Sequence, residues 1–468
     1  MQASPSASAG SAHFSASESG NRKNHSDFNG NFAQNNDLLF FRVGKISFNT
    51  QNILGRGCEG TVVYKGTFDG RDVAVKRVVS DFFNLADREV DLLRASDSHP
   101  NVIRYFCMES DSQFRYIALE LCWATFNDYV ESEEVQERCP LSVIHMLEQA
   151  TIGLSHLHSL KIVHRDIKPH NILLSEPNLN GNVNVLISDF GLCKKLTAGR
   201  NSFSKRSGFT GTDGWIAPEM LSPNVNSTFA VDIFSLGCVF YYVLSKGKHP
   251  FGDSFRRQGN IAAGVYDLTD VKHERPETCR HLIRLMIEFS PSQRPCVKVV
   301  LKHPMFWANS RILTFFQSAD EFQSFDFSNA LKTFKCKKKE GTRYDKKDVS
   351  DRVDKEDIQS LVVQTLEKGA WYVVNRDWRK QIHDGLLIDL KTRRTYRGNS
   401  IRDLLRALRN KKNHFRELPE EIKAVVGNVP EDLVAYFVDK FPHLLTHVHD
   451  ALRVCHDEPV FRHYYKSD

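Results

Sequence analysis

Residue types that could bind an anion and exchange protons are concentrated between Lys391 and Arg416. This segment holds ten Lys or Arg residues and a single acidic residue, Asp403. It also contains Tyr396, Asn410 and His414. Guanidinium groups bind phosphate, and an imidazole exchanges protons near neutral pH. The segment could therefore act on a phosphate-containing substrate, although taken alone it is explained more simply as a solvated basic helix.

A helix is predicted to carry most of this segment. Ser400 followed three residues later by Asp403 is typical of a capping box, so a helix should begin near Ile401. The i, i+3, i+4, i+7 spacing gives it one apolar stripe, made of Ile401, Leu404, Leu405 and Leu408. A different face carries three arginines, namely Arg402, Arg406 and Arg409.

A glycine-rich stretch, Leu54-Gly-Arg-Gly-Cys-Glu-Gly-Thr-Val62, offers a second site for phosphate. The GxGxxG pattern alone is weak evidence, and a dinucleotide site would need a helix directly after it. The β-branched and aromatic residues Thr61-Val-Val-Tyr64 instead predict a strand. The stretch is therefore expected to join two strands and to close over phosphates as a flap.

The next strand, Val73-Ala-Val-Lys76, ends in a lysine. Such a lysine usually faces solvent. Glu89, however, follows thirteen positions later in the helical pattern Ala86-Asp-Arg-Glu-Val-Asp-Leu-Leu93. This spacing predicts an ion pair between Lys76 and Glu89.

Three further motifs follow in order: His164-Arg-Asp-Ile-Lys-Pro-His-Asn171, Ile187-Ser-Asp-Phe-Gly191 and Ala217-Pro-Glu219. With the glycine-rich stretch and Lys76, they resemble the complete signature set of protein kinases. The resemblance covers about residues 44–307. It implies an α+β bilobal fold, with a β-rich small lobe and a helical large lobe.

The resemblance also implies roles for individual residues. Asp166 accepts the proton of the incoming hydroxyl, and Lys168 lies near the transferred phosphoryl group. Asn171 and Asp189 supply hard oxygen ligands for Mg²⁺. The ATP-binding residues would be Leu54, Gly55, Gly57, Gly60, Val62, Lys76, Glu89, Glu120, Cys122, Asn171 and Asp189. Asp232 and Arg294 would be structural anchors, with Arg294 pairing with Glu219.

Arg165, next to Asp166, is typical of kinases whose activation loop is ordered by phosphorylation. Phosphate on a loop residue adds negative charge that can recruit arginines. Gly211-Thr212 together with Lys168 favours Ser or Thr over Tyr as the acceptor. The predicted phosphorylation sites are Ser202, Ser204 and Ser207. A pseudokinase is the alternative, but no catalytic position is missing.

Composition sets the overall organisation. A chain of 468 residues with 41% hydrophobic and 26% charged residues indicates two or three globular domains. A net charge of +6 is too mild to identify a nucleic-acid partner. Ten cysteines without a CxxC pair predict reduced thiols. The longest apolar run, Ile233–Leu244, is too short for a membrane span, and the N-terminus has no signal pattern, so a soluble, cytoplasmic protein is expected.

Three segments follow from these patterns. Residues 1–36 are rich in Ser, Ala, Asn and Gly and are predicted to be disordered. Residues 37–307 would form the kinase domain. Residues 308–468 would form a small, mostly helical domain, with a solvated charged loop over 335–356. A stretch containing Phe315, Phe316, Phe322, Phe325 and Phe327 is expected to pack on the kinase large lobe.

The C-terminal part resembles the kinase-extension nuclease of the kinase/endoribonuclease family that acts in the unfolded protein response. The matching strings include Asp403-Leu-Leu-Arg, Phe415-Arg-Glu-Leu-Pro and Phe441-Pro-His-Leu-Leu. This resemblance assigns four catalytic residues for RNA cleavage: Tyr396, Arg409, Asn410 and His414. His414 would be the acid and Tyr396 the base partner, while Arg409 and Asn410 grip the scissile phosphate. The product would carry a 2′,3′-cyclic phosphate, and no metal is needed.

The resemblance further implies partners and a location. Nucleotide in the kinase cleft and phosphorylated loop serines would favour a back-to-back homodimer or a higher oligomer. The substrates would be RNA stem-loops, including mRNA, and not DNA. Sequence-independent RNA affinity would come from Arg402, Arg406, Lys411 and Lys412. The family works at the cytosolic face of the endoplasmic reticulum membrane, which requires an N-terminal membrane span absent from this sequence.

Two alternatives remain. The chain could be a plain Ser/Thr signalling kinase whose helical tail is a docking module. It could also be a nucleotide-sensing platform whose kinase fold serves only to dimerise the nuclease.

Overall fold

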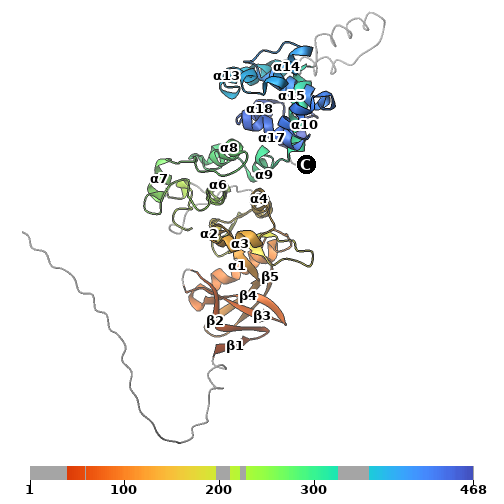
Figure 1. The fold of residues 1–468 in the computed structure, drawn as a ribbon. Coiled ribbons are helices and arrows are strands. Elements are labelled where there is room, and N and C mark those ends of the chain that lie inside the picture. The colour runs from red at the N-terminus through yellow and green to blue at the C-terminus, as the bar shows by residue number, and fades with distance from the viewer. Residues whose placement is uncertain (1–38, 58–59, 197–210, 222–227, 325–357, 467–468) are drawn as a thin grey trace, which may run out of the picture.

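The computed structural model describes residues 39–57, 60–196, 211–221, 228–324 and 358–466. Three bodies follow one another along the molecule: a lobe built on a β-sheet, a helical lobe and a second helical body (Figure 1). The predicted fold class, an α+β bilobal fold followed by a small all-α domain, is confirmed. The predicted disordered segment 1–36 and the predicted charged loop 335–356 lie outside the described residues.

The small lobe is an antiparallel sheet of six strands in the order β1-β2-β3-β4-β6-β5. The stretches predicted as strands, Thr61–Tyr64 and Val73–Lys76, correspond to the start of β3 and the middle of β4, so Lys76 lies inside its strand and not at its end. The strands are β1 (Phe40–Val43), β2 (Ile46–Arg56), β3 (Val62–Phe68), β4 (Arg71–Val79), β5 (Tyr105–Ser110) and β6 (Phe114–Glu120).

Side chains alternate between the two faces of this sheet, as the strand period of two requires. Val73 and Val75 belong to a core on one face, together with Phe48. Ile117 and Leu119 belong to the core of the large lobe on the other face. Helix α1 (Phe83–Ser96) packs against β4, β5 and β6 and carries Glu89. The lysine of β4 and the glutamate of α1 are thereby brought to one side of the sheet.

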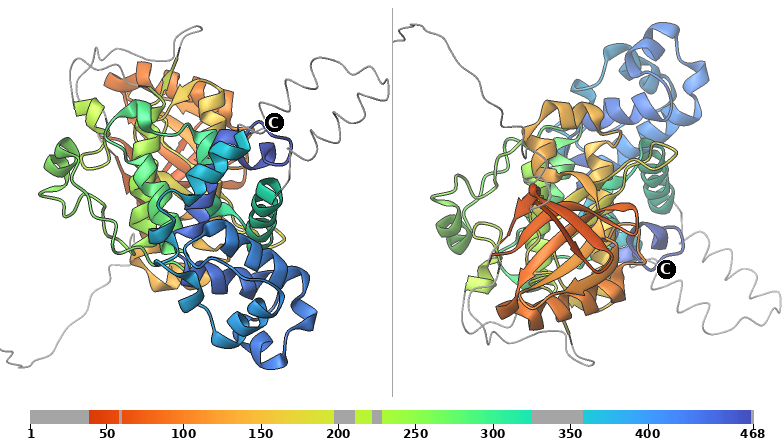
Figure 2. Two further views of the ribbon diagram at one scale, coloured as in Figure 1. Left: turned by 90° about the horizontal axis from the view of Figure 1, so that it is seen from above. Right: turned by 90° about the horizontal axis from the view of Figure 1, so that it is seen from below.

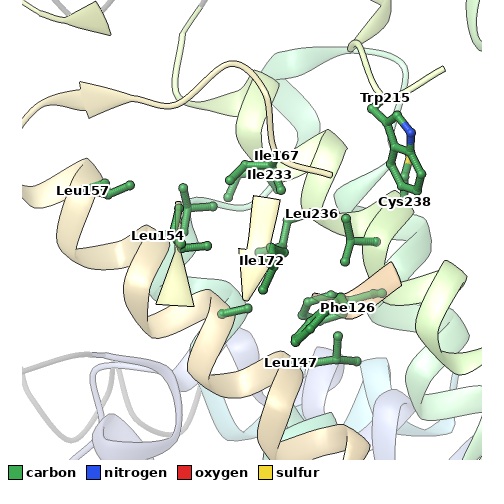
Figure 3. Packing of buried hydrophobic residues seen from close by; sticks show 14 of the residues in the cluster. Phe126, Leu147, Leu154, Leu157, Ile167, Ile172, Trp215, Ile233, Leu236 and Cys238 are labelled. Atoms are coloured by element: carbon green, nitrogen blue, oxygen red, sulfur yellow. The ribbon is translucent and has the colours of Figure 1, made fainter. Parts of the chain in front are cut away.

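The large lobe is mostly helical. Its core is packed between α4 and α6, and side chains from both helices point toward Phe126 and Ile172 (Figure 3). The predicted apolar run Ile233–Leu244 lies in α6 and is almost entirely buried. The helices are α2 (Phe126–Glu131), α3 (Glu133–Arg138), α4 (Val143–Ser159), α5 (Pro218–Leu221), α6 (Ala230–Leu244), α7 (Arg257–Ala263), α8 (Pro276–Met286) and α9 (Val297–Leu301). Short strands complete the lobe: β7 (Cys122–Thr125), β8 (Ile162–Val163), β9 (Ile172–Ser175), β10 (Val185–Ile187) and β11 (Lys194–Lys195).

The predicted structural ion pair in this lobe is formed. Arg294 Nη1 and Nη2 donate to Glu219 Oε1 and Oε2 at 2.7 and 2.8 Å. The two side chains are 0% and 4% exposed. Each of the two charges is therefore neutralised by the other, because neither side chain is accessible to water.

Replacing Arg294 with leucine should destabilise the large lobe by about 3–5 kcal/mol, because Glu219 would lose the partner that compensates its buried charge. Calorimetry of the whole chain should show a lower unfolding temperature for this lobe. Lys65→Met is the matched control, since Lys65 and Asp72 form an exposed pair at 3.5 Å. Exposed pairs contribute little, so equal shifts in the two variants would contradict the assignment.

Within residues 309–324 and 358–466, the regular elements of the C-terminal body are all helices. Residues 358–367 form a helix, and α15 begins at Ile401 as predicted. The named helices are α10 (Asn309–Ser324), α13 (Ala370–Val373), α14 (Asp384–Arg393), α15 (Ile401–Asn413), α16 (Glu420–Val426), α17 (Glu431–Lys440), α18 (Leu444–Leu452) and α19 (Arg462–Tyr465). They extend to one side of the two lobes, with the C-terminal residues close to α10 (Figure 2).

Helix α10 corrects one prediction. It packs on α15, α17 and α18 of the C-terminal body rather than on the large lobe. Phe315 and Phe316 are fully buried in the C-terminal core, and Phe322 packs against it. Phe325 and Phe327 lie outside the described residues. The helix that follows the large lobe is thus part of the C-terminal core.

The two cores adjoin at Trp307, which is buried in the C-terminal core, whereas Met305 belongs to the large-lobe core. Polar groups bridge the two bodies beside it. The ring of His281 on α8 lies 3.0 Å from His303 and 3.0 Å from the carboxylate of Asp450 on α18. In the part of the chain that the structure describes, no helix is long and apolar enough to cross a bilayer.

Candidate active sites

The cleft between the lobes is organised around Lys76. Its ammonium group donates to Glu89 at 2.6 Å and to Asp189 at 2.9 Å. Burial opposes a charged lysine, but the charges of Asp189 and Glu89 prevail and raise the pKa of Lys76 above its usual range. The charge of Lys76 in turn lowers the pKa of Asp189 to about 2. Lys76 thus stays a cation and Asp189 an anion, as phosphate and metal binding require.

A second network surrounds Asp166. Its carboxylate accepts hydrogen bonds from Lys168 Nζ at 2.8 Å and from Asn171 Nδ2 at 2.9 Å. The backbone amide and hydroxyl of Thr212 donate to its other oxygen at 3.0 and 2.7 Å. Lys168 Nζ also donates to the Thr212 hydroxyl at 2.6 Å. The structure therefore brings together the predicted catalytic residues Asp166, Lys168 and Asn171.

Asp232 holds the backbone of this loop in place. Its buried carboxylate accepts from the amides of His164 and Arg165 at 2.9 and 2.8 Å. Arg165 and Asp189 both have positive φ angles, 70° and 63°, which cost energy for residues other than glycine. The anchoring predicted for Asp232 is confirmed, and it stabilises a strained backbone beside the catalytic carboxylates.

The glycine-rich stretch joins β2 to β3, as predicted. The amide of Gly57 donates to the carbonyl of Thr61 at 2.9 Å, which closes the loop. Gly60 has a φ of +76°, a conformation that glycine adopts without strain. The predicted nucleotide contacts lie along this hairpin: Leu54, Gly55, Gly57, Gly60 and Val62.

Two of the predicted ATP-binding residues lie at the connection between the lobes. Glu120 ends β6 and Cys122 begins β7. The Glu120 amide donates to the Arg104 carbonyl at 2.9 Å. Burial raises the pKa of the Cys122 thiol well above its usual range, so it stays neutral.

The residues present fit a divalent cation. Asn171 Nδ2 is fixed by the backbone carbonyl and the carboxylate of Asp166, both at 2.9 Å, which leaves the amide oxygen as the ligand atom. The carboxylate of Asp189 supplies a second hard oxygen. The predicted activation-loop residues Ser202, Ser204 and Ser207 lie outside the described residues.

The C-terminal body contains a second candidate site on α15. Asn410 Nδ2 donates to the Tyr396 hydroxyl oxygen at 2.8 Å. Arg409 is a neighbour of this pair, with Nη2 3.4 Å from Asn410 Oδ1. His414 follows one turn later and its amide donates to the Asn410 carbonyl at 2.9 Å. Three of the four predicted residues are thus joined by hydrogen bonds, and the fourth adjoins them through the helix.

The His414 side chain is 42% exposed, and its Nδ1 lies 2.6 Å from Glu417 Oε1. This contact fixes the direction of the ring. Tyr396 is 4% exposed and packs edge-on against Trp378. The site therefore combines a buried phenol, a partly buried guanidinium and an accessible imidazole.

Several cations predicted to contact an RNA backbone are turned inward instead. Lys411 is 3% exposed and is paired with Asp389. The Arg406 side chain is 15% exposed and lies 3.6 Å from Asp320. Arg402 is partly buried, with Nη2 3.4 Å from the Gln323 carbonyl. Lys412 donates to Gln317 at 3.1 Å. Helix α10 contacts Arg402, Arg406 and Lys412, and Asp389 of α14 pairs with Lys411, so these cations are less exposed than the basic pattern suggests.

The predicted start of α15 is confirmed, but its capping differs in detail. The Ser400 hydroxyl accepts from the Asp403 amide at 3.3 Å. The Asp403 carboxylate does not return this bond and accepts instead from the Arg397 amide at 2.6 Å. Glu367 accepts from the Ser400 hydroxyl at 2.6 Å and from the Ile401 and Arg402 amides at 3.3 Å. A glutamate from another helix thus completes the cap.

Sequence reasoning missed one residue at this site. Asp320 of α10 is buried, and its carboxylate lies 2.6 Å from Arg409 Nη1. Burial raises the pKa of Asp320, while the charges of Arg409 and Arg406 act against this shift. The only signal in the sequence is one acidic position in an aromatic-rich stretch, and it does not reveal the partner.

Residues 48–306 match the family model for the protein kinase domain. The chain belongs to the protein kinase family. This domain implies the use of ATP and a divalent metal ion. Residues 346–465 match the model described as Ribonuclease 2-5A, so the helical body after the kinase is the predicted nuclease-type domain. The resemblance inferred from the motifs is confirmed.

Two of three similar curated relatives are named for both a kinase and an endoribonuclease. The serine/threonine-protein kinase/endoribonuclease ire-1 of Caenorhabditis elegans is 49% identical over 91% of this kinase chain and 41% of the relative. The serine/threonine-protein kinase/endoribonuclease IRE2 of Homo sapiens is 48% identical over 91% of this chain and 43% of the relative. The sensor for unfolded proteins in the ER ire1 of Schizosaccharomyces pombe is 38% identical, over 88% of this chain and 38% of the relative. The chain spans about two fifths of the length of these relatives.

Proposed function

We propose that this chain is a bifunctional Ser/Thr protein kinase and metal-independent endoribonuclease of the unfolded protein response. The observation that carries the proposal is the presence of two assembled sites in one chain. Lys76 is joined to both Glu89 and Asp189 in the cleft, and Tyr396 is hydrogen-bonded to Asn410 in the C-terminal body. The kinase domain would span residues 37–307 and the nuclease domain residues 308–468.

In the kinase cleft, the chain's own residues position ATP and the acceptor. Lys76 binds phosphate oxygens, and Asp166 takes the proton of the incoming hydroxyl. Lys168 neutralises charge that develops on the transferred phosphoryl group. Mg²⁺, held by Asp189 and Asn171, would supply further charge neutralisation. The acceptors we assign are serines of the activation loop in a second copy of the chain, namely Ser202, Ser204 and Ser207.

In the nuclease site, cleavage breaks the bond between phosphorus and the 5′-oxygen of the RNA. The 2′-hydroxyl attacks the phosphorus and forms a 2′,3′-cyclic phosphate, and Tyr396 assists removal of its proton. His414 gives a proton to the leaving 5′-oxygen. Arg409 and Asn410 stabilise the negative charge on the phosphate oxygens. The Glu417 contact directs the His414 ring, so the opposite nitrogen, Nε2, is the atom we assign to proton transfer.

The two activities would be coupled through assembly. Nucleotide that binds the dimer-competent conformation more tightly shifts the population toward it. A back-to-back homodimer, or a larger oligomer, would then bind RNA stem-loops, including mRNA, and not DNA. The curated relatives include a protein named as a sensor for unfolded proteins in the ER. On that basis we place the activity at the cytosolic face of the endoplasmic reticulum membrane.

A direct test combines purified chain with an RNA stem-loop, with and without ADP and Mg²⁺. We expect nucleotide to stimulate cleavage and mass spectrometry to find 2′,3′-cyclic phosphate ends. At protein concentrations high enough to dimerise without nucleotide, cleavage should persist in EDTA. Absence of cleavage at concentrations where ultracentrifugation shows a dimer would refute the nuclease assignment. The chain would then be a signalling kinase with a docking tail.

Replacing Asp320 with asparagine should slow RNA cleavage by about 10–100-fold, because Arg409 would lose the charge that orients it. Single-turnover cleavage of the stem-loop measures the effect. Arg406→Gln is the matched control, since it removes the more distant cation beside Asp320 and leaves the Arg409 contact at 2.6 Å intact. Equal rates in wild type and Asp320→Asn would show that Arg409 needs no such partner.

A further inference from the structure

A short turn in the nuclease domain contacts the backbone at Tyr396 and at the two residues that follow it. The 3₁₀ turn Trp378–Lys380 donates three hydrogen bonds to three consecutive carbonyls. Arg379 Nη1 donates to the Tyr396 carbonyl at 3.2 Å. Trp378 Nε1 donates to the Arg397 carbonyl at 3.0 Å, and its amide donates to the Gly398 carbonyl at 2.9 Å. The segment has no helix or strand of its own to satisfy these groups.

Asp377 fixes the direction of the arginine in this turn. Its two carboxylate oxygens accept from Arg379 Nε at 2.9 Å and from Arg379 Nη2 at 2.8 Å. The carboxylate also accepts from the Arg379 amide at 3.1 Å. Such a two-point contact restricts the guanidinium to one plane. The remaining donor, Nη1, is therefore directed at the Tyr396 carbonyl.

Gly398 permits this approach. A Cβ at residue 398 would overlap the Asp377 carboxylate and come within 2.5 Å of Arg379 Nε. Any side chain at this position would therefore displace the Asp377 carboxylate and the Arg379 guanidinium from their present contacts. The glycine after Tyr396 and Arg397 is required by the close contact with the turn.

The ring of Tyr396 is held from two more directions. Trp378 is fully buried and meets the ring edge-on, with centroids 5.9 Å apart. Asn410 donates to the hydroxyl at 2.8 Å. Because a ring is rigid, its backbone position, its packed face and its hydroxyl contact together determine where the phenol oxygen lies.

We propose that Asp377, Trp378, Arg379 and Gly398 form a clamp that positions Tyr396 for RNA cleavage. None of the four contacts the hydroxyl of Tyr396, so they are positioning residues and not catalytic ones. The inference rests on the proposed nuclease function. It adds to that function a structural reason for the glycine at position 398 and a second segment on which the cleavage rate depends.

The test compares Gly398→Ala and Arg379→Gln with wild type in the full chain. Both should lower kcat for stem-loop cleavage by about 10–100-fold, since misplacement of a reacting group by about 1 Å costs up to about 100-fold. The KM for RNA should change less than about threefold, because Arg409 and the rest of α15 are untouched. Gly385→Ala in α14 is the matched control, since its methyl meets its nearest neighbours at 3.3 Å. Arg379→Gln adds no bulk, so this variant still tests the clamp if Gly398→Ala does not fold.

A double mutant separates positioning from general stability. In a Tyr396→Phe background, the remaining cleavage should be the same with and without Arg379→Gln, because the group being positioned is absent. A further loss in that background would overturn the clamp and indicate a structural role. Full activity of both single variants would also overturn it. If wild type itself shows no cleavage that depends on His414, the proposed nuclease function fails and the clamp fails with it.

Discussion

Replacing Asp166 with asparagine is expected to lower autophosphorylation by about 10²–10⁴-fold, the usual contribution of a positioned proton acceptor. Asp166 accepts from Lys168, Asn171 and Thr212, so an amide of the same shape cannot satisfy all these donors. Transfer of labelled phosphate from ATP measures the rate, and peptide mapping locates the modified serines.

The same variant should keep RNA cleavage driven by ADP. Asp166 does not contact the Lys76–Glu89–Asp189 cluster in the described interactions, so nucleotide should still bind the cleft. Asp91→Asn on the exposed side of α1 is the control for carboxylate replacement. Unchanged autophosphorylation in Asp166→Asn would contradict the catalytic assignment. Loss of ADP-driven cleavage would show that the nuclease requires phosphorylation and not only bound nucleotide.

Replacing His414 with alanine is expected to slow RNA cleavage by about 10²–10⁴-fold, because the 5′-oxygen would leave without a proton donor. The kinase reaction should be unaffected. Stem-loop cleavage under single-turnover conditions and autophosphorylation are measured on the same preparation.

His456→Ala is the matched control, since His456 is also 42% exposed and lies in the same domain. An equal effect of the two substitutions would point to a general loss of surface charge. Retention of cleavage in His414→Ala would exclude His414 as the acid and would favour a docking role for the tail.

The kinase site could be predicted because most of its residues lie in short sequence motifs. Lys76 lies in the β-branched strand β4, and Glu89 lies on the apolar-periodic helix α1 that packs against that strand. Each signal is local, and the sheet and helix place the two together at 2.6 Å. The Arg294–Glu219 pair spans 75 positions, and only its resemblance to a known arrangement made it predictable.

The nuclease part was predictable only along α15. Its capping serine, apolar stripe and terminal His414 lie within one helix length, so their spacing is informative. The contacts made by Asp320 and Arg379 leave no sign in the helical or strand periodicity of the sequence. They join segments that meet only after the domain folds. For the same reason the inward direction of Arg406 and Lys411 could not be read from a basic pattern. A buried cation and a solvated one look alike in sequence.

The packing of α10 has a consequence for how this chain can be divided. Sequence comparison begins the nuclease unit at residue 346, yet Ile312, Phe315 and Phe316 fill its interior. A fragment cut at that position would expose the inner faces of α15, α17 and α18 and would lose Asp320 from beside Arg409. The folding unit is therefore larger than the unit that similarity delimits. Helix α10 supplies part of the interior of the C-terminal body, so a boundary at residue 346 would divide one folding unit and not separate two.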